Sequence, residues 1–164
     1  MDSLSLKNLS LQLVEMAAKF SDCYKRKVGA AIVPASYNYH CLNPNRVYFG
    51  FNQAPNESQK CIECPRMDAA PGKKDHLCHI IHAEAMAIMQ ALYKTGELGD
   101  TLGDWEMMVT LFPCSYCCSL IVMAKVKKLY YIEDYYDEKK QNYLKNYLES
   151  SGVKVVKIDS PERL

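Results

Sequence analysis

Two short motifs constrain this chain more than any other feature. Residues 82–84 read H-A-E, and residues 113–117 read P-C-S-Y-C. The strand-like segment E-M-M-V-T-L-F at 106–112 lies between them, and each motif opens a helix-like pattern. These spacings fit a metal centre, a thiol redox pair, or a helix that happens to contain cysteines. A metal centre requires that the two helix starts lie side by side in the fold.

The metal-centre reading has a direct physical basis. Cys114 and Cys117 are three residues apart, so on a helix they share a face, and a helix N-terminus favours the thiolates that a metal needs. With His82 they make three ligands, which leaves the fourth position of tetrahedral Zn²⁺ open, as in catalytic sites. Glu84 points away from the imidazole and can reach a bound water. H-x-E followed by P-C-x-x-C is the pattern of zinc nucleobase deaminases.

The two alternatives are weaker. A C-x-x-C pair at a strand–helix junction is also typical of thioredoxin-like redox proteins. Here a proline, Pro113, precedes the first cysteine and H-A-E precedes the strand, which favours metal. Cys118 follows Cys117 directly and faces about 100° away on a helix. We therefore expect Cys118 to be a small core residue and not a ligand.

Composition excludes several classes of protein. The chain has 164 residues, 49% apolar and 24% charged, which suits one soluble domain spanning 1–164. A net charge of +1 gives no field for nucleic acid or an anionic membrane. No stretch resembles a signal peptide or a membrane span. Eight cysteines without a secretion signal favour metal binding in a reducing compartment, so we expect a cytoplasmic protein.

Hydrophobic periodicity predicts an alternating order of elements, with Pro113 in the first turn of the third helix. An antiparallel hairpin feeding a parallel portion predicts a three-layer α/β/α sandwich with a mixed five-stranded sheet. A long irregular segment at 52–80 is typical of a functional loop. The predicted elements are a helix at 5–20, strands at 27–34 and 46–51, a helix at 82–94, a strand at 106–112, a helix at 114–126, a strand at 127–133, a helix at 137–152 and a strand at 153–158.

Over about residues 5–158 the chain resembles the zinc-dependent deoxycytidylate (dCMP) deaminases of the cytidine deaminase superfamily. G-F-N-Q-A-P at 50–55 is similar to the family's G-Y-N-G-x-P, and H-A-E-A-M-A-I at 82–88 is similar to H-A-E-x-N-A-I. The segment from Thr110 to Tyr131 is similar to T-x-x-P-C-x-x-C followed by a helix and a strand. The closing Y-Y-D and G-V-K-V-V-K-I distinguish this group from the tRNA adenosine deaminases.

The resemblance implies hydrolytic deamination of dCMP to dUMP, which supplies thymidylate synthesis. It implies that Zn²⁺ is held by the histidine and cysteines described above and that Glu84 shuttles protons. It also implies substrate contacts from Asn52, from backbone near Ala83 and Pro113, and from a tyrosine beyond the fourth strand. The tyrosine candidates are Tyr131, Tyr135 and Tyr136.

Two positions depart from the family's pattern. Met86 replaces the asparagine of H-A-E-x-N, and Gln53 replaces the last glycine of G-Y-N-G. In the family the G-Y-N-G region helps to form the site where dCTP activates and dTTP inhibits, with Mg²⁺ accompanying the triphosphate. The substitutions leave open that regulation and the choice of dCMP over dCTP or a modified dCMP. The low net charge argues against a tRNA base, and a non-catalytic zinc protein is the remaining alternative.

The remaining cysteines raise a second metal site. Some family members carry a structural zinc in this region, and four thiolates would close such a site and stabilise the loop. His76 and His79 are competing ligands, while Cys41 is expected to be free. The family resemblance also implies a homo-oligomer, often a hexamer. The apolar segments 46–51 and 82–93 are candidate interfaces, and each is equally explained as part of the core. The expected ligands of the second zinc are Cys23, Cys61, Cys64 and Cys78.

Overall fold

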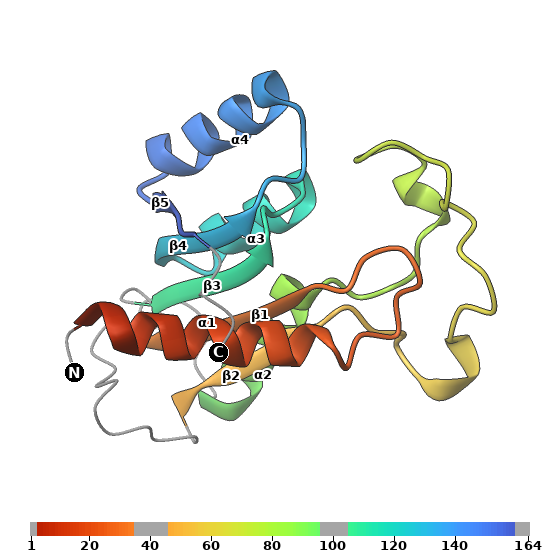
Figure 1. The fold of residues 1–164 in the computed structure, drawn as a ribbon, viewed down its shortest axis with the longest axis horizontal. Coiled ribbons are helices and arrows are strands. Elements are labelled where there is room, and N and C mark those ends of the chain that lie inside the picture. The colour runs from red at the N-terminus through yellow and green to blue at the C-terminus, as the bar shows by residue number, and fades with distance from the viewer. Residues whose placement is uncertain (1–2, 35–45, 96–104, 160–164) are drawn as a thin grey trace.

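A computed structural model describes residues 3–34, 46–95 and 105–159 (Figure 1). The order of helices and strands is the one that periodicity predicts, with two short 3₁₀ helices, η2 and η3, added within the irregular segment. The elements are α1 Ser3–Ala18, β1 Gly29–Pro34, β2 Tyr48–Phe51, η2 Glu57–Gln59, η3 Asp75–Leu77, α2 Ala83–Thr95, β3 Trp105–Leu111, α3 Ser115–Met123, β4 Val126–Glu133, α4 Glu138–Ser150 and β5 Lys154–Lys157.

The strands form one mixed five-stranded sheet in the order β2-β1-β3-β4-β5. β1 pairs antiparallel with both β2 and β3, and β3, β4 and β5 run parallel. The predicted hairpin and parallel portion are therefore both confirmed. The segment between β2 and α2 extends away from the sheet (Figure 1).

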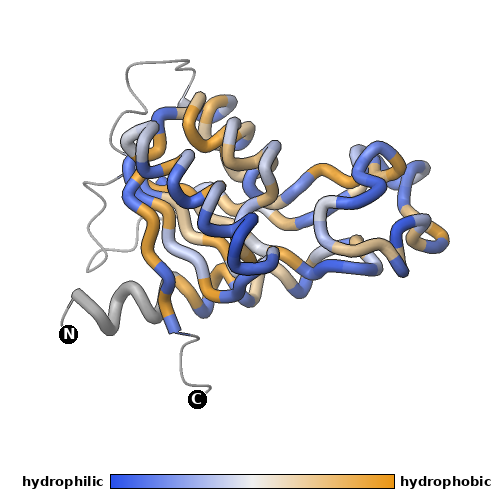
Figure 2. The backbone as a smooth tube through the Cα atoms, turned by 90° about the horizontal axis from the view of Figure 1, so that it is seen from above, coloured by the Kyte–Doolittle hydropathy of each residue, from blue (hydrophilic) through white to orange (hydrophobic). Residues whose placement is uncertain are grey.

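Alternation along the strands divides the interior into two layers. Ala30 and Ile32 of β1 join the large cluster that α2, α3 and α4 cover. Ala31 faces the other side, where Val14 of α1 packs. Figure 1 shows α1 in front of the sheet and α2 behind it, and Figure 2 shows hydrophobic residues concentrated along the strands. The predicted three-layer α/β/α sandwich is confirmed.

The third helix differs from its prediction at both ends. It begins at Ser115 and ends at Met123 instead of running over 114–126. Lys125 adopts a left-handed φ of 57°, which stops the helix and turns the chain into β4. Pro113 precedes the N-cap residue Cys114, so its expected position in the first helical turn was wrong.

Two glycines allow the helices to pack closely on opposite faces of the sheet. A Cβ at Gly50 would lie 2.1 Å from the carbonyl oxygen of Ala83 and 2.6 Å from the nitrogen of Ala87, both in α2. A Cβ at Gly29 would lie 2.1 Å from the carbonyl oxygen of Val14 in α1. The backbone of β2 therefore fixes the distance to the helix that His82 precedes.

This contact generates the first prediction. Gly50→Ala should push α2 away from β2 and lower the free energy of unfolding by about 1–3 kcal/mol, because backbone atoms cannot move aside as a side chain does. It should also weaken zinc retention, since the H-A-E motif lies at the start of α2. Gly29→Ala, the matched control, should cost similar stability and keep zinc, because α1 carries no candidate ligand. Thermal melts with zinc analysis measure both; parent-like stability of Gly50→Ala would contradict the packing.

Candidate zinc and nucleotide site

Both metal motifs lie at helix starts, and their first ligands are the cap residues. The amide of Met86 donates to the carbonyl of His82 over 3.0 Å, so His82 is the N-cap of α2. The amide of Cys118 likewise donates to the carbonyl of Cys114 over 2.9 Å. Cap residues have extended backbone instead of helical backbone. Their side chains can therefore turn toward the gap between the two helices.

The three candidate ligands converge in this gap. The Sγ atoms of Cys114 and Cys117 lie 3.4 and 3.5 Å from Nδ1 of His82. The ligand atoms of all three lie within 4.8 Å of one another, and no other group of His, Cys, Asp and Glu in the described ranges meets this criterion. One imidazole and two thiols fit Zn²⁺ in both number and chemistry, with a fourth position open to water.

Hydrogen bonds among the three candidate ligands shift the pKa of each group. The hydrogen bond from Cys117 holds the pKa of Cys114 at about 4, while Cys114 raises the pKa of Cys117 well above its usual value. The hydrogen bond with Cys114 raises the pKa of His82 to about 11. These pKa values favour a thiolate at Cys114 beside an imidazolium at His82. A divalent cation replaces these protons, so its binding is coupled to proton release.

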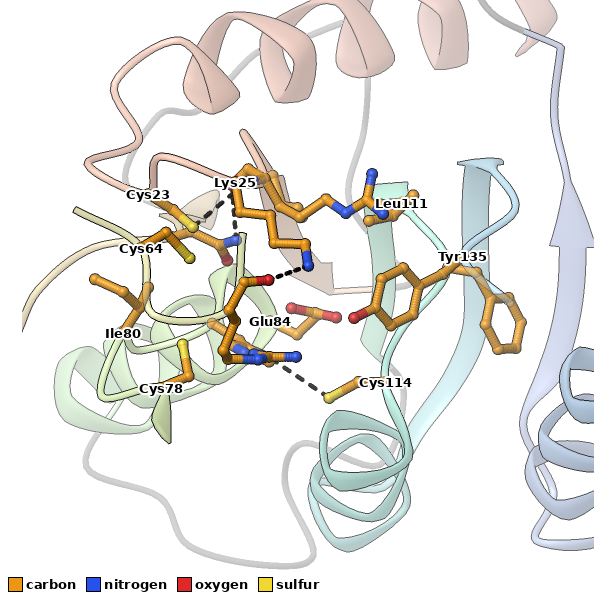
Figure 3. Close-up of a pocket in the computed structure, with 15 residues that line it drawn as sticks. Cys23, Lys25, Cys64, Cys78, Ile80, Glu84, Leu111, Cys114 and Tyr135 are labelled. Carbon is orange, nitrogen blue, oxygen red and sulfur yellow. Dashed lines mark hydrogen bonds between the residues drawn. The ribbon is translucent and has the colours of Figure 1, made fainter. Parts of the chain in front are cut away.

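Glu84 is the carboxylate beside this cluster. It lies in the first turn of α2 and is only 4% exposed. Burial, together with the neighbouring Cys114, raises the pKa of its carboxyl to about 7. Glu84 and Cys114 line the same pocket, with Tyr135 facing them (Figure 3). A carboxyl group with a pKa near neutrality is suited to both accepting and donating a proton.

The pocket forms at the edge of the sheet where β1 begins and β2, β3 and β4 end. Residues 23–28 lead into β1, while Asn52, Phe112 and Tyr135 lie just beyond the ends of β2, β3 and β4. This is the carboxyl edge of the parallel strands, where open α/β sheets bind ligands. Its apolar wall suits a flat ring and consists of Val28, Ile80, Leu111 and Phe112.

Three cations also line the pocket, and two are already engaged. The Lys25 ammonium donates to the carbonyls of Arg66 and Ala69. The Arg66 guanidinium pairs with Asp75. Arg26 lies 5.6 Å from the ring centroid of Tyr135, and its guanidinium has no carboxylate partner in the part of the chain that the structure describes. Sequence reasoning missed these cations. The basic run K-R-K at 25–27 was the available signal.

The expected substrate residues have different positions. The Asn52 side chain is buried and bonded at both ends, to the carbonyl of Arg26 over 3.0 Å and to the amide of Ala83 over 2.9 Å. The N–H of Ala83 is therefore already used within the protein. The carbonyl of Pro113 accepts from the Cys118 thiol at 3.6 Å, and Cys118 itself packs in the core, as expected.

The three candidate tyrosines also differ in their positions. Tyr135 lines the pocket. Tyr131 is buried in the core, where its ring packs edge-on against Phe112 at 4.9 Å. Tyr136 is also a core residue. Tyr135 is thus the tyrosine of the three that the pocket presents to a ligand.

The four cysteines proposed for a second metal lie near one another. Cys23 forms a small buried cluster with Ala54 and Ile80, against which Cys61 and Cys78 pack. Burial raises the pKa of Cys61, and Cys78, Cys23 and Cys64 nearby raise it further. Their sulfurs do not meet the 4.8 Å criterion, so the described loop holds them close without closing a site.

The two competing histidines differ in their contacts. Nε2 of His79 lies 3.7 Å from the Cys61 sulfur and 2.8 Å from the carbonyl of Gln59. His76 lies in η3. Cys41 lies outside the described residues.

No helix among the described residues is both long enough and apolar enough to cross a membrane. A family model for the cytidine and deoxycytidylate deaminase zinc-binding region matches residues 5–133.

Two of the three relatives described next are named deoxycytidylate deaminase. The chain is 34% identical to deoxycytidylate deaminase of Mycobacterium phage D29 over 74% of this chain and 89% of that protein. It is 28% identical to ComE operon protein 2 of Bacillus subtilis over all of this chain and 77% of that protein. It is 30% identical to the Saccharomyces cerevisiae deoxycytidylate deaminase over 83% of this chain and 40% of that protein.

The fold agrees with a solved structure. The dCMP deaminase of cyanophage S-TIM5 superposes with a TM-score of 0.67 at 24% identity, covering 96% of this chain and all of that one. Because the family model spans most of the chain and the ligand pattern lies within it, this chain belongs to the cytidine and deoxycytidylate deaminase family.

Proposed function

We propose that the chain is a zinc-dependent hydrolase that deaminates dCMP to dUMP and ammonia. The observation that carries the proposal is a buried carboxylate beside three candidate zinc ligands, in a pocket that Arg26 also lines. His82, Cys114 and Cys117 are the proposed zinc ligands, and Glu84 is the catalytic acid–base. The names of the phage and yeast relatives support this substrate.

The chemistry follows from the positions of these groups. When bound, zinc supplies a water molecule acidic enough to serve as a nucleophile at neutral pH. Glu84 accepts the proton of this water as it adds to the ring carbon that bears the amino group. Glu84 then donates a proton to the adjacent ring nitrogen and assists the departure of ammonia. One carboxyl acts first as base and then as acid, which its raised pKa of about 7 favours.

Recognition of a nucleotide instead of a free base would use the other side of the pocket. Arg26 has no carboxylate partner among residues 3–34, 46–95 and 105–159 and lies beside Tyr135, and a guanidinium forms bidentate bonds with phosphate. The apolar wall and Tyr135 would enclose the pyrimidine ring. We therefore assign the 5′-phosphate of dCMP to Arg26. A related cytosine nucleotide, such as dCTP or a modified dCMP, is the alternative substrate, and a non-catalytic zinc protein is a more distant one.

Replacing Glu84 tests the assigned chemistry. Glu84→Gln keeps the shape of the side chain and removes its ability to move a proton. We expect unchanged zinc content and a loss of dCMP turnover of about 10²-fold or more. Ultraviolet assay and metal analysis measure the two quantities. Turnover that persists at the parent rate would show that another group moves the proton.

Replacing Arg26 tests the nucleotide assignment. Arg26→Gln should lower kcat/KM for dCMP by about 10- to 100-fold, because one charge-assisted bond to phosphate is lost. The activity on deoxycytidine, which has no phosphate, should change little. The exposed Lys127→Gln is a matched control for loss of one positive charge. Equal losses on both substrates would place the phosphate elsewhere.

A second, structural zinc is also proposed for Cys23, Cys61, Cys64 and Cys78. Its support is the packing of Cys61 and Cys78 against a small core that contains Cys23, with Cys64 close enough to Cys61 to raise its pKa. Binding would require the four sulfurs to move closer, and it would tie residues 61–78 to the start of β1.

Zinc stoichiometry tests this second site. The parent protein should carry two zinc ions per chain, and Cys64→Ser should carry one. Cys118→Ala, which removes a core thiol, should retain both. Atomic emission on protein purified without added metal gives the count. One zinc in the parent, unchanged by Cys64→Ser, would contradict the site.

Regulation and assembly rest on the resemblance together with two local observations. The backbone of Gln53 pairs with that of Ile81, the residue before His82. A dCTP or dTTP effector bound with Mg²⁺ near Gln53 would therefore act on the segment that carries the proposed zinc ligand His82. A homo-oligomer, such as a hexamer, is supported by an apolar groove between α2 and α3. The groove is lined by Ile88, Met89, Leu92, Tyr116, Leu120 and Met123.

The proposal also includes a cytoplasmic location.

A further inference from the structure

We propose that Asn52 is a positioning residue that holds the zinc-bearing helix α2 and the Arg26 segment at a fixed separation, through its two side-chain hydrogen bonds. The inference rests on the proposed function for its catalytic meaning. The geometry that carries it is independent of substrate.

The first bond of Asn52 solves a problem at the start of α2. The first amides of a helix lack intrahelical partners, and the N-cap side chain commonly satisfies one of them. Here the N-cap is His82, whose Nδ1 faces the two thiols and so cannot cap the helix. The Oδ1 atom of Asn52, from the end of β2, accepts from the Ala83 amide at 2.9 Å instead. The group that caps α2 thus comes from the residue that follows β2 and not from the N-cap residue of the helix.

The second bond reaches the opposite side of the pocket. Nδ2 of Asn52 donates to the carbonyl of Arg26 over 3.0 Å. The side chain of Arg26 extends over Tyr135, where we place the phosphate. One planar amide therefore spans from the residue after the zinc ligand to the residue assigned to phosphate.

Asn52 is itself held firmly. Asn52 is 6% exposed. Its main-chain N–H donates to the carbonyl of Val28 at 3.1 Å, and its main-chain carbonyl accepts from the Asp22 amide at 3.0 Å. The hydroxyl of Ser21 donates to the same carbonyl at 2.8 Å. A side chain anchored in this way transmits its position to both partners. A displacement of about 1 Å between reacting groups can cost about 10²-fold in rate.

The competing role is direct contact with the nucleotide, which the family resemblance implies for Asn52. In this structure the acceptor atom is occupied by Ala83, and one N–H of the amide is occupied by Arg26. Direct contact predicts effects only when substrate is present. Positioning predicts effects on the zinc site in the absence of substrate.

The experiment uses the zinc-loaded full chain without nucleotide. Zinc release to a chromogenic chelator should be about 10- to 100-fold faster in Asn52→Ala, as for loss of a group that orients a metal ligand. Asn52→Asp keeps an acceptor for the Ala83 amide but loses the donor to the Arg26 carbonyl, so its zinc release should be faster than in the parent and slower than in Asn52→Ala. The matched control is Asn56→Ala, because Asn56 is exposed and its side chain bonds to Gln59 and Ser58, outside the pocket.

A second measurement needs no variant and stands even if Asn52→Ala does not fold. Hydrogen exchange by NMR should show the Ala83 amide protected in the parent protein before nucleotide is added. The proposal is overturned if that amide exchanges like an exposed one. It is also overturned if Asn52→Ala releases zinc like the control and changes only KM for dCMP. A failure of dCMP turnover would overturn the proposed function and leave these results to stand separately.

Discussion

The meeting of two helix starts at one point is the constraint on which the rest of this structure depends. His82 and Cys114 each occupy an N-cap position, where extended backbone lets the side chain leave the helix axis. Cys114 follows the carboxyl end of β3, and His82 follows Ile81, whose backbone pairs with Gln53 just beyond β2. The close contact of Gly50 with α2 fixes the depth of one helix start. A shift of either helix would separate the ligands and leave two thiols and an imidazole without a metal.

The electrostatics of the pocket follow from that meeting. The hydrogen bond between Cys114 and His82 favours a thiolate beside an imidazolium, whereas burial penalises the charge of the neighbouring Glu84 carboxyl. A divalent ion compensates the thiolates and releases the histidine proton. The opposite side of the pocket holds Arg26, which has no carboxylate partner in the described part of the chain. The proposed function uses the first side for the metal and the base and the second side for the phosphate.

Much of this arrangement could be predicted from the sequence, because periodicity and motif spacing are local signals. The nine helices and strands, their order and the mixed sheet follow from them among the described residues. Helix ends were less predictable: the left-handed turn at Lys125 has no glycine to announce it. Pocket-lining Arg26 and the cap from Asn52 were missed because both depend on contacts between segments distant in sequence. Tyr131 and Tyr135 look alike in sequence, and only the fold puts one in the core and one in the pocket.

The central claim is that bound zinc and this pocket together hydrolyse dCMP. The most direct measurement follows ammonia release and conversion of dCMP to dUMP by purified protein, first zinc-loaded, then stripped by a chelator, then reloaded. The account predicts turnover that is lost on stripping and returns with stoichiometric zinc. Zinc-loaded, folded protein that converts neither dCMP nor any related cytosine nucleotide would contradict it.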